Sequence, residues 1–189
     1  DPYDGKNLSL FLKKLEGKAQ QFNWLTLLSY PIGDPPRNKC LLNSYGEITM
    51  ADVTQKARRY LGTDNREDQD SDMIFNCLRK SITDSVYALV TTEPERYTFI
   101  IDGQRTVDGP CFLAAIIDQT YTNTLANTEA TRENLSSLAE YMESLPDSNV
   151  EQFNNYVKVQ LETLAAGGET TSDLITNLFK GYSKVKDKT

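Results

Sequence analysis

The apolar positions of this chain recur mostly every three or four residues, which is the spacing of one face of an α-helix. In the first such segment they are Leu8, Phe11, Leu12, Leu15, Ala19 and Phe22. This stripe predicts a helix over residues 8–22. Asn7 is its predicted N-cap, because an asparagine side chain can accept a hydrogen bond from a free amide of the first turn.

Proline and capping residues set the limits of the next elements. Three prolines in segment 30–37 lack amide donors and restrict the residues before them, so this segment is predicted to be a loop. Thr49 stands three residues before Asp52, which is the spacing of a capping box and predicts the start of a second helix. Gly62 is its predicted end.

The middle of the chain carries one segment with a different pattern. A helical stripe extends as far as Pro94, with a break predicted near Thr83. In residues 96–107, by contrast, β-branched and aromatic residues flank the dipeptide Asp102-Gly103, which favours a tight two-residue turn. We expect one β-hairpin there, followed by a helix with Pro110 in its first turn.

Segment 121–128 is rich in Thr and Asn and is the predicted linker between two lobes, residues 1–124 and 125–189. Beyond it, helical stripes run over residues 135–145, 150–164 and 174–182. Ser148 and Glu151 have the spacing of a capping box for the second of these, and Gly167-Gly168 is its predicted stop. The predicted fold class is mostly α, with two helical lobes and a single hairpin.

Composition removes several classes of chemistry. The chain has no histidine, which excludes a Ser-His-Asp triad, a Cys-His dyad and a histidine-containing zinc site. Cys40, Cys77 and Cys111 are far apart in the sequence, so we expect three buried thiols in a reducing compartment rather than a metal site or a redox pair.

The charge pattern indicates no site either. A net charge of −7 argues against binding of a nucleic-acid backbone by these residues alone, and no apolar run is long enough to cross a bilayer. The acidic segment 64–72 lacks the glycine and the terminal glutamate of a calcium loop and is predicted to be solvated. The lysines of segment 180–188 are expected to favour the C-terminus of the last helix.

Three aspartates near the hairpin have ordinary structural interpretations. Asp102 belongs to the turn, Asp108 to the start of the following helix, and Asp118 to a solvent-exposed face. We therefore predict no catalytic residue, no cofactor and no metal, and we do not expect an enzyme. The sequence has no initiator methionine and no signal-peptide pattern, and we expect it to be a piece of a longer polypeptide.

Three stretches taken together resemble a known family. They are Pro2–Asn7, the run Asp108-Gly109-Pro110-Cys111-Phe112-Leu113, and segment 150–182 with its runs Phe153–Val157 and Asp173–Phe179. Together they are similar to the Gag capsid region of LTR retrotransposons, copia-type elements most of all. Glu151, Phe153 and Tyr156 resemble part of the retroviral major homology region, although Asp147-Ser148 stands in place of its Gln-Gly pair and Val159 in place of its Arg.

The resemblance implies a structural capsid protein that assembles into pentamers and hexamers, closing a virus-like shell around the element's RNA in the cytoplasm. Its partner would be itself, and RNA would be bound by regions outside this chain, with no membrane and no small-molecule substrate. The candidate interface residues are Trp24, Leu27, Tyr141, Tyr156 and Tyr182.

Two alternatives remain open. A non-enzymatic α-helical adaptor or regulatory domain that binds a protein partner would account equally well for the lack of catalytic residues. An enzyme that relies on carboxylates, or on a metal held without histidine, has less support, and it would require that Asp108→Ala abolish activity with the fold intact. Salt- and concentration-dependent self-association separates the capsid from the adaptor, because salt screens repulsion between protomers of charge −7.

Overall fold

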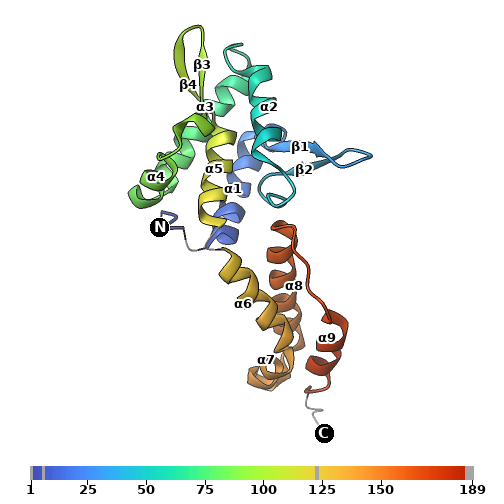
Figure 1. Cartoon of the computed structure of the whole chain (residues 1–189). Helices are drawn as coiled ribbons and strands as arrows, with labels where there is room; N and C mark the ends of the chain where they lie inside the picture. The colour runs from blue at the N-terminus through green and yellow to red at the C-terminus, as the bar shows by residue number, and fades with distance from the viewer. Residues whose placement is uncertain (1, 6, 122–123, 186–189) are drawn as a thin grey trace. The chain divides into compact units, whose positions relative to one another are not determined.

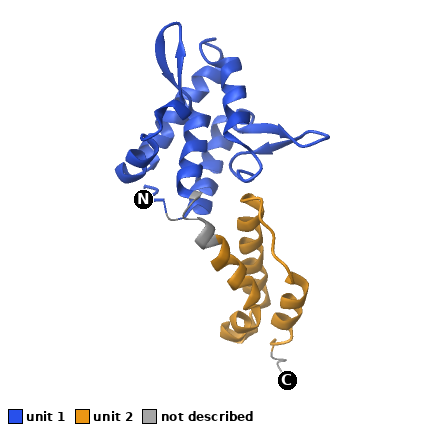
Figure 2. Ribbon diagram, in the orientation of Figure 1, with its two compact units in different colours: residues 1–123 blue, residues 124–189 orange. Residues whose placement is uncertain are grey.

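The computed structural model describes residues 2–5, 7–121 and 124–185 (Figure 1). The described residues are mostly helical with two short antiparallel hairpins, which confirms the mostly-α fold class. The chain divides into two compact units, residues 1–123 and 124–189, compared with the division at 124/125 expected from the sequence (Figure 2). Lys186 and Lys188 of the predicted basic segment lie outside the described residues.

Seven elements of the first unit precede its second hairpin, and one helix follows it. They are α1 (Leu8–Phe22), β1 (Ser29–Ile32), β2 (Arg37–Cys40), α2 (Met50–Tyr60), α3 (Arg66–Ser81), α4 (Asp84–Val90), the 3₁₀ turn η1 (Pro94–Arg96), β3 (Thr98–Ile101), β4 (Gln104–Val107) and α5 (Gly109–Tyr121). The second unit contains α6 (Thr124–Ser136), α7 (Leu138–Ser144), the 3₁₀ turn η2 (Pro146–Ser148), α8 (Val150–Ala166) and α9 (Leu174–Tyr182).

Helix α5 is the centre of the first unit. It contacts α1, α2, α3 and α4, and every residue from Cys111 to Ile117 is buried, which explains why its sequence is apolar on all sides. Its start lies directly against α3: a Cβ at Gly109 would be 2.3 Å from the carbonyl oxygen of Ser71 and 2.7 Å from the amide nitrogen of Phe75. Only glycine permits this approach of two helices.

Segment 30–37 is not the loop that its prolines predict, and a second hairpin lies there. Strands β1 and β2 pair in antiparallel register, with Pro31 opposite Asn38. The prediction was wrong because each strand of a two-stranded hairpin has an outer edge, where the missing amide of Pro31 breaks no ladder. Burial of Tyr30 anchors β1, while Gly33, at φ +88°, and the other two prolines form the turn.

The predicted hairpin is confirmed with shorter strands. β3 and β4 pair in antiparallel register, and Asp102 and Gly103 have φ of 49° and 78°, the two positive values that a type I′ turn needs. Residues 94–96 form the 3₁₀ turn η1 before the hairpin.

The helix limits agree with the sequence in unit 1. Thr49 and Asp52 form the capping box of α2, and Gly62, at φ +76°, follows its end. The break near Thr83 is confirmed, because α3 ends at Ser81 and Thr83 caps α4.

Two limits in unit 2 differ from the sequence predictions. Helix α8 is capped by Asn149, whose Oδ1 accepts from the Gln152 amide at 3.0 Å, and Ser148 with Glu151 forms no capping box. Ser148 has a positive φ of 50°, so the chain enters the helix one residue later than predicted. Residues 124–128 of the predicted linker are helical, since α6 begins at Thr124 and buries Thr128 and Thr131.

The cysteine prediction holds for one residue of three. Cys111 is fully buried in α5, whereas Cys40 and Cys77 are half-buried, and all three are free thiols.

Candidate assembly surfaces

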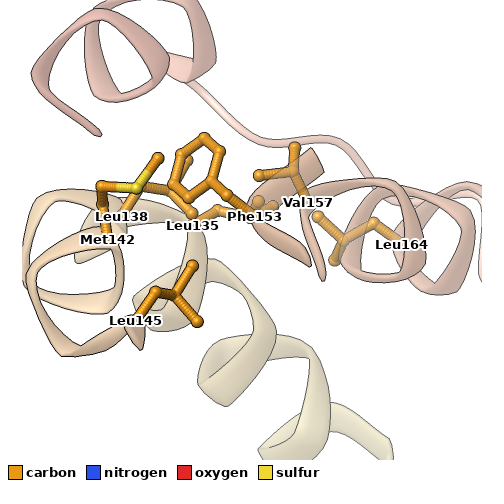
Figure 3. Close-up of a cluster of buried hydrophobic side chains, with 7 residues drawn as sticks. All are labelled: Leu135, Leu138, Met142, Leu145, Phe153, Val157 and Leu164. Carbon is orange, nitrogen blue, oxygen red and sulfur yellow. The ribbon is translucent and has the colours of Figure 1, made fainter. Parts of the chain in front are cut away.

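The second unit encloses a small apolar core (Figure 3). Its buried members are Leu135, Leu138, Met142, Leu145, Phe153, Val157 and Leu164. Six further side chains are half-buried against this cluster: Tyr141, Tyr156, Leu161, Leu174, Leu178 and Val185. These short helices leave part of their apolar surface uncovered.

Aromatic rings form one margin of this core. Tyr141 and Tyr156 stack with their ring centroids 3.8 Å apart, and burial raises the pKa of the Tyr156 phenol. Phe153 meets Tyr182 edge to face at 5.1 Å, and the Tyr182 hydroxyl donates to Oδ1 of Asn154. Tyr141 and Tyr156 are thus held by each other, and Tyr182 is fixed at its hydroxyl while much of its ring is exposed.

Helix α9 carries a wider apolar arc than the unit covers. Its inner edge packs closely, because a Cβ at Gly181 would lie 2.6 Å from Cζ of Phe153. Its outer edge is open: Ile175 is 71% exposed, Phe179 72% and Tyr182 41%. These three residues follow the spacing i, i+4, i+7 and form one stripe, which we call the α9 stripe.

The candidate interface residues named from the sequence fall into two groups. Trp24 and Leu27 are 2% and 3% exposed in the core of unit 1, and the Trp24 ring stacks on Phe22 at 5.0 Å. In this conformation neither side chain is available to a second molecule. Tyr141 and Tyr156 are half-buried, and Tyr182 is exposed within the α9 stripe.

The other two residues that resemble the major homology region, Glu151 and Phe153, differ in burial. Glu151 is exposed in the first turn of α8, while Phe153 is fully buried in the core. Sequence reasoning placed Ile175 and Phe179 in the last helix but did not single them out as surface residues. The sequence of α9 has five large apolar residues within nine positions, which is more than one narrow helix face can hold. This excess could have indicated that some of them are exposed.

A buried polar network lies in the first unit. The Asp108 carboxylate accepts from the Tyr60 hydroxyl, from Oγ of Ser71 at 2.8 Å and from the Cys111 amide at 2.7 Å, which confirms that Asp108 starts a helix. Burial first, and then the Asp108 charge, raises the pKa of both Tyr60 and Cys111. Each of these three donors has the Asp108 carboxylate as its acceptor, so the network joins α2 and α3 to the start of α5.

The other two aspartates lie as the sequence suggests. Asp102 is in the β3–β4 turn, and Asp118 is exposed and paired with Arg96. Within the described parts of the chain, no group of three or more His, Cys, Asp or Glu side chains is placed to hold a metal ion. None of the described helices is both long enough and apolar enough to span a bilayer.

A pocket of about 520 Å³ lies between the first hairpin and α2. Within it Nζ of Lys56 donates to the carbonyls of Thr26 at 2.6 Å and Ser29 at 3.0 Å, and lies 5.2 Å from the centroid of the Tyr30 ring. Burial lowers the pKa of Lys56. Lys56 therefore fastens the hairpin to α2, and the pocket has walls of mixed charge that match no single ligand chemistry.

The chain matches no model of a known protein family, no characterised protein and no solved structure.

Proposed function

We propose that this chain is a self-assembling structural protein of the capsid type, similar to the Gag capsid region of LTR retrotransposons. Copies of the chain associate into rings and then into a shell around RNA. The observation that carries the proposal is the α9 stripe, in which three large apolar side chains are exposed on one helix. Exposed apolar surface of this kind is typical of a protein–protein contact.

The composition of α9 favours a second copy as the partner of this stripe. Lys180 is the sole charged residue of the helix, so two α9 stripes can meet with little charge repulsion. Aromatic side chains such as Phe179 and Tyr182 are also the types that contribute most to interfaces. Each contact is small, and a closed shell repeats it many times, so weak individual affinity is sufficient.

The net charge of the chain supports the proposal that contacts between copies and RNA binding are made by different segments. With a net charge of −7, these residues would repel a phosphate backbone at long range. RNA is accordingly bound by segments outside this chain, and the chain supplies the contacts between copies.

The test is light scattering and negative-stain electron microscopy of the whole chain, at several concentrations and from low to high salt. Wild-type protein should form closed shells or tubes of regular width, more readily at high salt. A monodisperse monomer under every condition would contradict self-assembly and favour the adaptor alternative.

A matched pair of variants connects the outcome to the stripe. The double substitution Ile175→Ser with Phe179→Ser should abolish assembly while the circular dichroism spectrum stays unchanged. The control is Ile100→Ser, because Ile100 is 70% exposed but lies in β3 of the other unit. If both variants assemble like the wild type, α9 is not the contact.

A further inference from the structure

A second surface of the first unit has a distinctive chemistry. A pocket of about 360 Å³ lies between α1 and the end of α3. The buried side chains of Phe11 and Leu15 line it, together with the half-buried thiol of Cys77. We call it the lysine pocket, because Lys14, Lys18 and Lys80 also line it.

The three lysines carry uncompensated charge. No ion pair joins any of them to a carboxylate among the described residues, and no acidic residue lines the pocket. Lys14 and Lys18 are one helical turn apart, and Lys80 comes from the other wall. An apolar floor with three unpaired cations fits a ligand that combines an apolar group with carboxylates.

The chain itself presents such a group in its second unit. Val150, the first residue of α8, is 39% exposed, and Asp147 and Glu151 stand on either side of it in the sequence. Both carboxylates are exposed and form no ion pair among the described residues. We call residues 147–151 the acidic tip.

Other acidic residues fit the pocket less well. In segment 64–72, Asp68 accepts from the amide of Asp64 and Asp70 pairs with Arg66 at 3.5 Å, so both carboxylates are already engaged. A nucleic acid is also less suitable, because the net charge of −7 repels a polyanion at long range, whereas a tip with two carboxylates matches three local lysines.

We infer that the lysine pocket of one copy receives the acidic tip of a second copy, with Val150 against the apolar floor and the two carboxylates against the lysines. This inference rests on the proposed function and adds a contact separate from the α9 stripe. The two surfaces are different, so the contact is heterologous and generates a ring or an open chain of copies.

Charge exchange between two variants of the whole chain provides the test. Lys14→Glu with Lys18→Glu reverses the pocket, and Asp147→Asn with Glu151→Lys reverses the tip. Asparagine is chosen at 147 because that residue has a positive φ of 53°, which Asn tolerates. Each variant alone should associate about tenfold more weakly or worse in sedimentation experiments, and an equimolar mixture should regain association.

Lys13→Glu with Lys158→Glu is the control for the pocket-reversed variant, since it changes the net charge by the same amount and Lys13 and Lys158 do not line the pocket. At equal salt it should associate more strongly than the pocket-reversed variant, which has the same net charge. If the mixture of the two reversed variants associates no better than either alone, the pairing of pocket and tip is wrong.

Cys77 gives a direct measure of whether the pocket is covered. In a Cys40→Ser background it is the one partly exposed thiol, because Cys111 is fully buried. Its rate of modification by a maleimide should fall as protein concentration rises, and should stay high in the pocket-reversed variant. Protection that does not depend on concentration would mean that the same chain fills the pocket, which would overturn a second copy as the occupant.

Failure of this inference can be distinguished from failure of the proposed function. If wild type assembles through α9 while Cys77 is equally reactive at every concentration, the pocket contact is overturned and the proposed function stands. If the chain is always monomeric, the proposed function fails, and a capped synthetic peptide of residues 145–155 then decides the pocket. That peptide should protect Cys77, and the same peptide with Asp147→Asn and Glu151→Gln should not; equal protection, or none, overturns the inference.

Discussion

Replacement of Asp108 tests whether the buried network holds the first unit together. Asp108→Ala removes the acceptor of three donors: the Tyr60 hydroxyl, the Ser71 hydroxyl and the Cys111 amide. A buried donor without an acceptor costs about 1–3 kcal/mol, so three of them predict a loss of at least about 3 kcal/mol. That is a large share of the roughly 5–15 kcal/mol by which a domain is stable.

Asp108→Asn should cost less, about 1–2 kcal/mol, because one amide oxygen can still cap the helix while the charge is lost. Tyr60→Phe should cost about 1.5–3 kcal/mol in the wild type, as it removes a hydrogen bond to a charged group. In the Asp108→Ala background the same substitution should cost nothing or stabilise, since it removes an unpaired hydroxyl.

Urea unfolding followed by tryptophan fluorescence is the appropriate assay. The chain has a single tryptophan, Trp24, and it lies buried in unit 1, so its emission reports on the unit that contains the network. Tyr182→Phe is a matched control, because it removes a tyrosine hydroxyl from the other unit and should leave this transition in place. Equal costs of Tyr60→Phe with and without Asp108 would refute the coupling on which this reasoning rests.

Three further outcomes are expected. Folding raises the pKa of Cys111 and of Tyr60 above their ordinary values of 9.0 and 10.0, so unit 1 should lose stability as the pH rises above about 9. In the Tyr60→Phe variant this loss should be less steep above about pH 10. Urea midpoints that do not change with alkaline pH would contradict this. Gly109→Ala should lower the free energy of unfolding by about 1–3 kcal/mol or more, because the new methyl group would clash with backbone atoms of α3. An unchanged melting temperature would show that α3 and α5 can separate at no cost. Trp24→Ala should lower the free energy of unfolding in urea by about 3–5 kcal/mol, because this side chain is buried. Phe179→Ser should change that free energy by less than about 0.5 kcal/mol and should weaken association instead. The reverse ranking would mean that the assignment of core and surface is wrong.

Local patterns were sufficient for most of the helices and for one hairpin. The capping box of α2, the break at Thr83 and the Asp102-Gly103 turn each depend on residues within four positions of one another, and all three are present. The same reasoning missed the β1–β2 hairpin, because whether Pro31 disrupts a strand depends on which edge of that strand is paired.

The candidate surfaces depend on longer-range packing. The residues around Asp108 in the sequence predict only that it starts a helix. Its side chain also accepts hydrogen bonds from Tyr60 and Ser71, which are 48 and 37 residues away. Likewise Trp24 and Phe179 are both large aromatic residues in apolar segments, and the sequence analysis included Trp24, but not Phe179, among its five interface candidates. Folding buries Trp24 and leaves Phe179 exposed, because α9 packs through Gly181 and turns its other edge outward.

By itself, then, the sequence determined the mostly-α class, the Asp102-Gly103 hairpin, the absence of histidine chemistry and the acidic charge, since each follows from composition or from neighbouring residues. Tertiary structure alone decided which apolar residues remain for contacts and which lysines form no ion pair with a carboxylate of the described residues. The physical reason is that exposure and ion pairing are set by what packs against a side chain, and those neighbours come from distant parts of the chain.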